Sequence, residues 1–319
     1  MYLKILSSLL LIGLCLGAMA QKQKKTLTKE INFFSENDNY DFDLSDRYYT
    51  NGLLLQYNWL GKSKPGKKHL KKINRTELAQ RIYNPYKNNK SLAIVLQNMD
   101  RPFAGWLNAQ YGHTLVYPKG DVLIYDANLG VMGPASGGEQ VQKGWHSMLG
   151  LYRLYGWENQ VHNALGLGIN TSYYRSLAAS RSVTLHIATR AMVGTLFNNA
   201  SAGLLFKTGR LSKEHESGFW NSNLGVEKPA TGKGEWIFFL QPMIQVQASN
   251  ATVEGNLFSA DKGPYTTGIK NIVGQLQTGI YITGNRMGFK TAYTFRTAEG
   301  SQMKQGEHWG SFALTYRFR

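Results

Sequence analysis

The stretch "EWIFFLQPMIQVQAS" (residues 235–249) alternates between apolar and polar side chains at every second position. One set of alternate positions carries Trp236, Phe238, Leu240, Ile244, Val246 and Ala248; the other carries Gln241, Met243, Gln245, Gln247 and Ser249. Because successive side chains of a β-strand point to opposite faces, this period predicts a strand with one apolar and one polar face. An apolar face opposite a glutamine-rich face is typical of a sheet with lipid on one side and water on the other.

Similar alternation recurs along most of the chain. It predicts strands near 27–37, 49–60, 76–84, 106–117, 120–131, 162–174, 182–195, 199–208, 234–249, 270–283, 286–297 and 307–319. The apolar run "SLAIVLQN" (91–98) is an equally good third strand in place of 76–84. The even strand number, the strand length and the aromatic enrichment predict an all-β fold, an antiparallel transmembrane β-barrel of about twelve strands. Closure of the barrel also leaves no unpaired strand edge.

A soluble secreted β-sandwich is the alternative architecture, because two packed sheets would also bury apolar faces. The length of the alternation and the aromatic final segment "HWGSFALTYRFR" (308–319), with Phe318 next to last, favour the barrel. The sequence shows no sign of a second domain, so residues 21–319 are predicted to form a single outer-membrane barrel domain.

The first twenty residues, "MYLKILSSLLLIGLCLGAMA", combine one lysine, an apolar core and a small-residue end. This pattern predicts a secretory signal peptide at 1–20. A lipoprotein signal at Cys15 is disfavoured, because the bulky Leu14 stands where a small residue is needed. Without Lys4 the chain keeps 35 basic and 20 acidic residues, a formal charge of +15. Such a charge favours phosphate-rich partners, and secretion favours anionic lipid over nucleic acid.

Chain topology gathers three unusual connections at one rim of the predicted barrel. With both termini in the periplasm, the connections 38–48, 100–105 and 133–160 face the cell exterior. The basic segment "GKSKPGKKHLKKINR" (61–75) is a connector at the opposite rim. No protein partner is implied by any of these segments.

The first of these connections is unusually acidic for a basic chain. "ENDNYDFDLSDRYYTNG" (36–52) holds five carboxylates, and strand parity places Asp38 and Thr50 on the inward face near the barrel mouth. The spacing does not match an EF-hand, because Gly52 stands where that loop needs its last glutamate. A looser site of carboxylates, carbonyls and water would favour Ca²⁺. Asp41, Asp43 and Asp46 are interpreted as solvated linker residues.

The third connection contains a predicted helix at 138–149. Val141, Trp145 and Met148 form one apolar stripe at helical spacing. Glu139, Gln142 and His146 fall within about 60° of one another around the helix axis. The alternative to a functional histidine is a helix that packs its tryptophan on the barrel, with His146 a passive polar neighbour. Serine catalysis is disfavoured, because no G-x-S-x-G elbow or strand-borne His-x-Ser arrangement is present.

Four motifs together resemble the lipid A 3′-O-deacylase family of Gram-negative outer membranes. They are "ENDNY…DRYYTNG", "DRPFAGW", "LGVMGPASGGEQVQKGWH" and "GWENQ", and they occur in the family's order over residues 36–160. The resemblance implies a twelve-stranded barrel with its active site at the outer-leaflet end beside a loop helix. It also implies Ca²⁺-dependent hydrolysis that removes the 3′-linked acyloxyacyl group of lipid A in lipopolysaccharide.

The resemblance also suggests candidate site residues. His146 would be the general base that activates water, with Gln142 one turn before it. Asn37, Asp38 and Thr50 match the polar residues of the family's first two strands. The family's catalytic-loop glutamate corresponds to Glu158 or to Glu139, and Asp38 with Glu158 are the candidate Ca²⁺ ligands. The family's active-site lysine has no clear counterpart in this sequence.

Two other functions remain open on the sequence. The first is a non-enzymatic outer-membrane barrel, a small pore or scaffold, whose loops are structural. The second is an outer-membrane phospholipase that acts on glycerophospholipids. The enzyme hypothesis requires Asp38, Thr50, Gln142 and His146 to lie within a few ångströms of one another.

Overall fold

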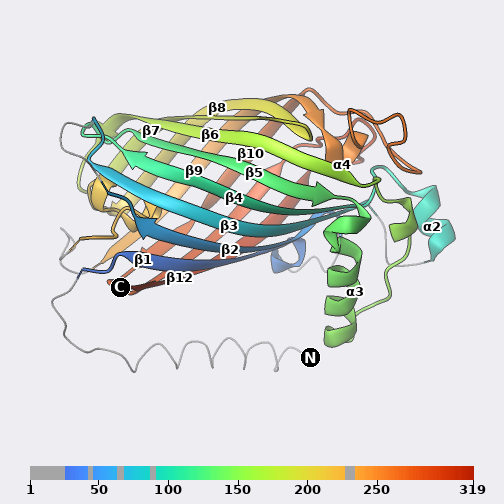
Figure 1. The fold of residues 1–319 in the computed structure, drawn as a ribbon, viewed down its shortest axis with the longest axis horizontal. Coiled ribbons are helices and arrows are strands. Elements are labelled where there is room, and N and C mark those ends of the chain that lie inside the picture. Colours follow the sequence, from blue (N-terminus) through green and yellow to red (C-terminus); the bar gives the residue numbers. More distant parts are fainter. Residues whose placement is uncertain (1–25, 42–45, 63–67, 87–90, 227–233) are drawn as a thin grey trace.

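The computed structural model describes residues 26–41, 46–62, 68–86, 91–226 and 234–319. Within these residues, twelve antiparallel strands close into a barrel (Figure 1). Each strand pairs with its neighbours in sequence, and the first and last strands pair from Lys29↔Phe318 to Asn37↔Gly310. The predicted fold class is therefore confirmed. The predicted signal peptide at 1–20 lies outside the described residues.

The strands overlap the twelve predicted segments. They are β1 (Lys29–Asn37), β2 (Tyr48–Leu60), β3 (Lys71–Asn84), β4 (Ala104–Val116), β5 (Val122–Met132), β6 (Ala164–Ala179), β7 (Val183–Gly194), β8 (Phe197–Arg210), β9 (Glu235–Asn250), β10 (Ile272–Thr283), β11 (Met287–Arg296) and β12 (Glu307–Phe318). The largest difference is at β3, which pairs with β4 from Lys71↔Val116 onward. The connector predicted at 61–75 is thus wrong for its last five residues, which are strand.

The alternative third strand at 91–98 is also wrong. This run forms the helix α2 (Leu92–Gln97), and the Ser91 side chain caps it by accepting a hydrogen bond from the Ile94 amide, 3.5 Å away. Short apolar runs cannot be assigned to strand or helix by their periodicity alone.

Further short helices occupy the connections. They are η2 (Asp38–Asp41), η3 (Pro134–Ser136), α3 (Gly138–Leu149), η4 (Trp157–Asn159), η5 (Glu214–Glu216), η6 (Gly218–Trp220) and α4 (Ala251–Glu254). Over the part of the chain that the structure describes, no helix has both the length and the apolar character needed to cross a membrane.

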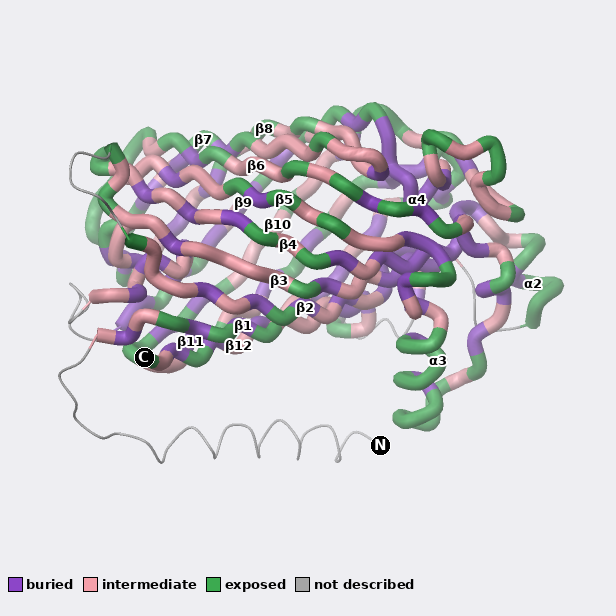
Figure 2. Tube along the Cα trace, in the orientation of Figure 1, coloured by how far each residue is buried: buried purple, intermediate pink, exposed green. Residues whose placement is uncertain are grey.

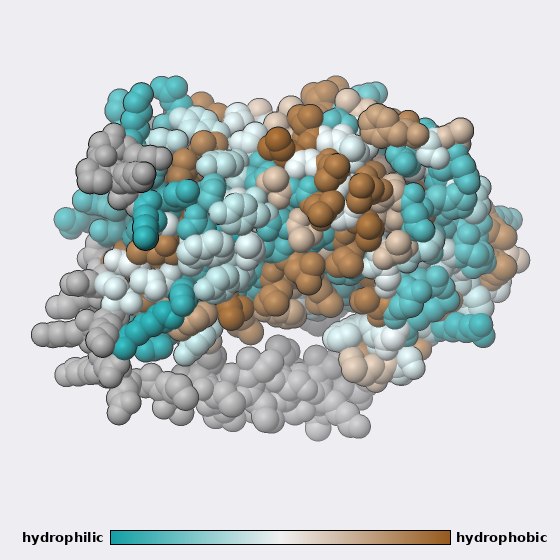
Figure 3. All heavy atoms as spheres, in the orientation of Figure 1, coloured by the Kyte–Doolittle hydropathy of each residue, from teal (hydrophilic) through white to brown (hydrophobic). Residues whose placement is uncertain are grey.

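The barrel exposes its apolar side chains and encloses polar ones. Along β9, Ile244 and Val246 are 63% and 58% exposed, whereas Phe239 and Gln247 are buried. Figure 2 shows this alternation of exposed and buried residues along the strands. In Figure 3, apolar residues gather across the middle of the visible face of the barrel, with hydrophilic residues toward both ends. Such an arrangement is costly in water and favourable in a bilayer, as expected of a membrane barrel.

The two rims of the barrel differ. The rim at which β1 begins and β12 ends is here called the terminal rim. The opposite rim, the loop rim, bears α2, α3 and α4 (Figure 1). The three unusual connections meet at the loop rim as predicted, since Tyr48 Oη donates to Asp100 Oδ2 at 2.7 Å and Gly133 N donates to Gly105 O at 3.0 Å.

The connection between β8 and β9 folds into the barrel at the terminal rim. Residues 211–226 of this connection are called the plug. Trp220 of the plug belongs to a buried cluster with Val116, Tyr174, Leu205 and Phe239, which come from β4, β6, β8 and β9. Glu214 of the plug also forms an ion pair with Lys207 of β8, 2.6 Å long. The terminal end of the lumen is therefore filled with packed side chains.

Candidate active site

The end of β1 begins the candidate site. The chain turns at η2, where Asn37 Oδ1 accepts a hydrogen bond from the Asn39 amide at 2.7 Å. Such side-chain-to-backbone bonds are the usual way in which Asn and Asp stabilise turns. Asp38 is buried, and its Oδ2 accepts from the Arg47 amide at 2.7 Å. The carboxylate of Asp38 thus ties the two ends of the acidic loop together.

The turn η2 folds over the outside of the barrel wall. Tyr40 packs edge-on against Phe312, with ring centroids 4.9 Å apart. Phe312 is 40% exposed and faces outward from β12. Tyr40 Oη also lies 2.6 Å from Ser35 Oγ on the outward side of β1. Asp38 belongs to this turn and not to a strand, so the alternation on which its predicted inward position was based does not apply to it.

Thr50 is likewise outside the regular alternation. The register between β2 and β3 shifts between Tyr49 and Asn51, which makes Thr50 the extra residue of a β-bulge. Bulges redirect a side chain, and they are common beside active sites. Thr50 Oγ1 lies 3.1 Å from Asp38 Oδ1 and 3.0 Å from Asp46 Oδ1. Since a hydroxyl has one proton, it can donate to only one of these two carboxylates at a time.

The helix α3 is present as predicted, but it presents the opposite face to the protein. Gln142 and His146 are buried, whereas Val141, Trp145 and Met148 are 40%, 45% and 67% exposed. The alternative in which the tryptophan packs on the barrel is thus contradicted. The polar side of the helix covers the site, and its apolar stripe points away from the protein.

The start of α3 rests against the outer surface of the wall. Outward residues of β3 are even-numbered, such as Leu78, and those of β4 are odd-numbered, such as Tyr111. Gln80 and Gly105 share these outward positions. A Cβ atom on Gly138 would come within 2.9 Å of Gly105 Cα and 3.4 Å of Gln80 Nε2. The two glycines therefore permit a close approach of helix and wall that larger residues would prevent.

His146 is held through both ring nitrogens. Nε2 lies 2.9 Å from Asp46 Oδ2, and Nδ1 lies 2.9 Å from the Tyr152 carbonyl oxygen. A carbonyl oxygen and an ionised carboxylate both only accept, so each ring nitrogen carries a proton in this arrangement, and Nε2 is the nitrogen that can act as a base once it has released its proton. Tyr152 completes the group, because its hydroxyl donates to Asp46 and its ring meets the imidazole edge-on, 4.9 Å between centroids.

The electrostatics of the three titratable groups follow from this geometry. Burial opposes the charge on His146, but hydrogen bonds to Asp46 and to the Tyr152 carbonyl outweigh burial and raise its pKa. Burial alone would raise the pKa of Asp46, whereas the bonds from His146 and Tyr152 lower it overall. Burial, and then the negative charge of Asp46, raise the pKa of Asp38 well above its ordinary value. The site therefore holds one firmly ionised carboxylate beside one that resists ionisation.

Gln142 lies one turn before His146 on the same buried side of α3. Its Oε1 accepts from Trp157 Nε1 at 3.0 Å, which fixes the side-chain amide. Its Nε2 is buried and has no hydrogen-bond partner among the described residues. Trp157 is itself packed against Phe103, 5.1 Å between ring centroids. The "DRPFAGW" and "GWENQ" motifs thus form the support on which Gln142 rests.

The candidate glutamates lie apart from this group. Glu158 is on η4 and exposed, and none of the contacts among the described residues joins it to His146 or Asp38. Glu139 forms an ion pair with Lys143, the next turn of α3. The structure brings all the candidate site residues except Glu158 to the region between η2, the start of β2 and α3. Their roles stay predictions; the candidates are Asn37, Asp38, Thr50, Gln142, His146 and Glu158.

Arg101 of the "DRPFAGW" motif is not a surface charge. Its side chain is fully buried and pairs with Glu299 at 3.0 Å, and it lies over the Tyr83 ring, 4.9 Å from the centroid. It cannot meet a lipid phosphate from that position. Its function here is to hold the loop rim together.

The residues present fit an oxygen-liganded cation. No group of three or more His, Cys, Asp or Glu within the described ranges could hold a metal. However, Asp38 and Asp46 approach each other through Thr50, and Asn39 donates to Asp46 Oδ1 at 3.2 Å. Asn39 Oδ1 is buried without a partner among the described atoms. Two carboxylates and one unpartnered amide oxygen are the ligand types that Ca²⁺ prefers. Asp43, interpreted from the sequence as a solvated linker residue, lies outside the described residues.

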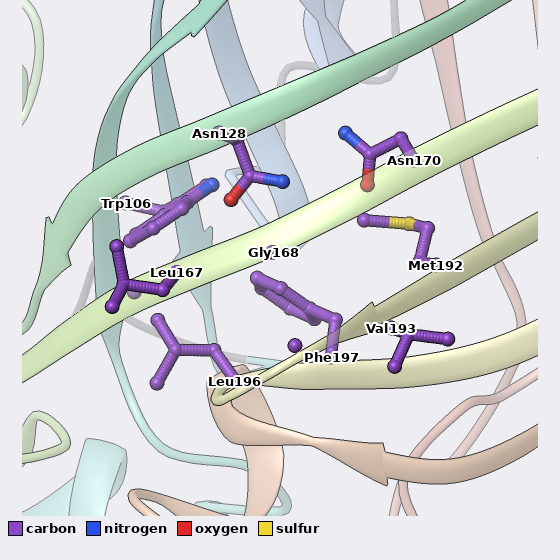
Figure 4. Close-up of a pocket in the computed structure, with 11 residues that line it drawn as sticks. Trp106, Asn128, Leu167, Gly168, Asn170, Met192, Val193, Leu196 and Phe197 are labelled. Atoms are coloured by element: carbon purple, nitrogen blue, oxygen red, sulfur yellow. The ribbon is translucent and has the colours of Figure 1, made fainter.

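Two cavities among the described residues are both small. One of about 10 Å³ is lined by Trp106, Gly166, Gly168 and Phe197 (Figure 4). This volume holds about one water molecule, so it suits neither a sugar nor an acyl chain. A second, narrower crevice borders Asp38 between Arg47 and Glu307.

Asp46 and Tyr152 are the site residues that sequence reasoning missed. Asp46 was interpreted as solvated, but it is 5% exposed and bonded to His146. Its partner lies 100 positions away, and no local pattern reveals such a pairing. Tyr152 follows α3 closely, and its polar aromatic side chain was the available signal.

The chain was compared with known proteins. The family model "Outer membrane protein LpxR" matches residues 5–318. No curated protein sequence matches the chain. The solved structure of LpxR from Salmonella typhimurium is 19% identical with a TM-score of 0.71, over 91% of this chain and 100% of that one. The β domain of the Bordetella autotransporter BrkA is 12% identical with a TM-score of 0.48, over 92% and 99%. From the family match over nearly its whole length, the chain belongs to the LpxR family of outer-membrane proteins.

Proposed function

We propose that this protein hydrolyses the ester that links the 3′-acyloxyacyl group to lipid A. One observation carries the proposal: in a member of the LpxR family, His146, Gln142, Thr50 and a buried carboxylate pair converge on the outside of the barrel wall beneath α3. A substrate anchored in the outer leaflet reaches such a site from the side, without entering the lumen.

In the proposed reaction, water attacks the ester carbonyl carbon and His146 Nε2 takes the proton. Nδ1–H stays bonded to the Tyr152 carbonyl, which keeps the ring in position and the tautomer fixed. In the described state Nε2 donates to the Asp46 carboxylate, so His146 has to lose this proton to solvent, and with it this contact, before Nε2 can accept a proton from the attacking water. The bond between the carbonyl carbon and the 3′ oxygen then breaks, and His146 returns its proton to the departing sugar oxygen.

The negative charge on the carbonyl oxygen needs stabilising groups. Gln142 Nε2 is a buried donor without a partner in the described structure and is suited to bind that oxygen. Asp38, Asp46 and Asn39 Oδ1 would hold Ca²⁺, which supplies positive charge for the same purpose. Glu158 remains a candidate ligand on the resemblance alone.

Neither alternative is supported to the same degree. A pore requires an open lumen, whereas the plug packs Trp220 into a buried cluster with residues of β4, β6, β8 and β9. A phospholipase would use the same groups, and only the products distinguish it.

The test is mass spectrometry of lipid A in vesicles incubated with the purified protein, with Ca²⁺ or with chelator. The variants are His146→Ala and, as a matched control, His162→Ala. His162 pairs with Asp261 at 2.8 Å on the same rim but is 44% exposed. We expect loss of the 3′-acyloxyacyl mass with wild type and His162→Ala, only with Ca²⁺, and none with His146→Ala. Intact lipid A with folded wild-type protein would refute the activity, and cleavage of glycerophospholipid instead would support a phospholipase.

A further inference from the structure

The outward face of α3 has an unusual composition for a surface helix. Around the helix axis, Val141, Trp145, Met148 and Leu149 adjoin on one side, and all four are at least 40% exposed. Gln140, Lys143 and Ser147 occupy the opposite side and are also exposed. Between them lies the buried side with Gln142 and His146. A helix in water would bury the apolar stripe and expose the polar residues that this one covers.

The position of α3 explains this reversal. In Figure 1 the helix lies across the barrel axis and projects beyond the wall at the loop rim. A helix across the axis of a membrane barrel runs parallel to the membrane plane. It therefore lies along the membrane surface, not perpendicular to it.

Its depth follows from its contact with the wall. Gly138 meets the outward-facing Gln80 and Gly105. Leu78, two residues from Gln80 along β3 on the same face, is 53% exposed. Residues two apart on a strand are separated by roughly 7 Å. The root of α3 is therefore directly adjacent to the apolar outer surface of the barrel.

We propose that α3 is an interfacial helix whose apolar stripe contacts the acyl chains of the outer leaflet, while Lys143 and its neighbours face the headgroups and water. Lipid is the occupant because the face of the wall beside the helix is already lipid-exposed. Interfacial helices of this type combine a strongly polar face with apolar and tryptophan residues on the other. The inference rests on the outer-membrane location of the protein and is independent of its proposed catalysis.

The test measures the surroundings of single spin labels. In a Cys15→Ser background the chain has no cysteine, so one cysteine can be introduced at a time. Met148→Cys and Val141→Cys report on the apolar stripe, and Lys143→Cys reports on the opposite face. Ile169→Cys on β6 is the lipid control, since Ile169 is 64% exposed on the barrel wall. Lys119→Cys, exposed between β4 and β5, is the water control.

The protein is reconstituted in phosphatidylcholine vesicles, with and without lipopolysaccharide. Collision rates with oxygen, which prefers lipid, and with a water-soluble nickel chelate are then compared by electron paramagnetic resonance. We expect the oxygen-to-nickel ratio at Met148 and Val141 to match that at Ile169 and to exceed that at Lys143 several-fold. A ratio at Met148 and Val141 that matches Lys119 would overturn the proposal. Heat-modified electrophoretic mobility checks that each variant is folded, and lipid A hydrolysis is not needed for any readout.

Discussion

The contact between α3 and the barrel wall leads to a sharp prediction about a single methyl group. Gly138→Ala would place a Cβ 2.9 Å from Gly105 Cα, where ordinary contacts lie at 3.4–4 Å. The neighbour is backbone in a paired strand, so it cannot move aside. The helix start must therefore shift by a few tenths of an ångström. Because His146 lies two turns along the same helix, the shift changes its position relative to Asp46 and to the substrate.

Misplacement of about 1 Å can cost about 100-fold in rate, so we expect Gly138→Ala to lower the deacylation rate about 10- to 100-fold. The matched control is Gly144→Ala in the middle of the same helix, where an added Cβ meets nothing within 4 Å. Alanine there should leave the rate unchanged and stabilise the helix by about 1 kcal/mol.

The assay is the initial rate of acyloxyacyl release from lipid A vesicles, with heat-modified mobility as the check on barrel folding. Full activity in Gly138→Ala would refute the reasoning, because the wall contact would then not set the position of the histidine. Equal losses in both variants would point to a general effect of altering the helix.

Four further outcomes follow from the described contacts. Asp46→Asn removes the charge that holds the α3 histidine and should lower kcat about 10²–10⁴-fold in lipid A assays. The control Asp261→Asn changes an exposed carboxylate and should leave kcat unchanged. An Asp46→Asn variant as fast as the wild type would contradict this prediction. Thr50→Val leaves two buried carboxylates without their shared donor and should cost about 1–3 kcal/mol in denaturant unfolding, so unchanged stability would count against the shared bond. Trp220→Ala empties the centre of the plug and should cost about 3–5 kcal/mol in the same measurement; a loss under 1 kcal/mol would mean that the plug packs loosely. Ca²⁺ at about 100 times its Kd should stabilise the wild type by about 2.7 kcal/mol in thermal unfolding, and an equal shift in Asp38→Asn would exclude that residue as a ligand.

Much of the fold could be predicted from the sequence, because strand alternation is a local property. In β9 the polarity of each residue indicates the face of the sheet on which its side chain lies, and the observed burial follows the predicted alternation along that strand. The third strand was the difficult element, since its first residues, from Lys71, are polar on both faces. The run 91–98 was ambiguous because it is apolar but too short to show whether its period is that of a strand or of a helix.

The site was predicted in part. The resemblance identified His146, Gln142, Asp38, Thr50 and Asn37 as candidates, and the structure brings all five together. Parity placed the carboxylates inside the barrel, but it applies only to regular strand, and the bulge at Thr50 and the turn η2 both interrupt it.

The sequence by itself determined the closed barrel, the existence of the α3 helix and the rim at which the unusual loops gather. The strands and the helix depend on the period of apolar residues, which is a local property of each segment. The rim of each loop depends on how many times the chain has reversed direction before it, which can be counted along the sequence. Only the tertiary structure decided that Asp46 reaches His146, and that the helix turns its polar side to the protein. The pairing joins residues 100 positions apart, and the helix orientation depends on the surrounding medium, because beside a lipid-facing wall the apolar side of a helix is the one that points outward.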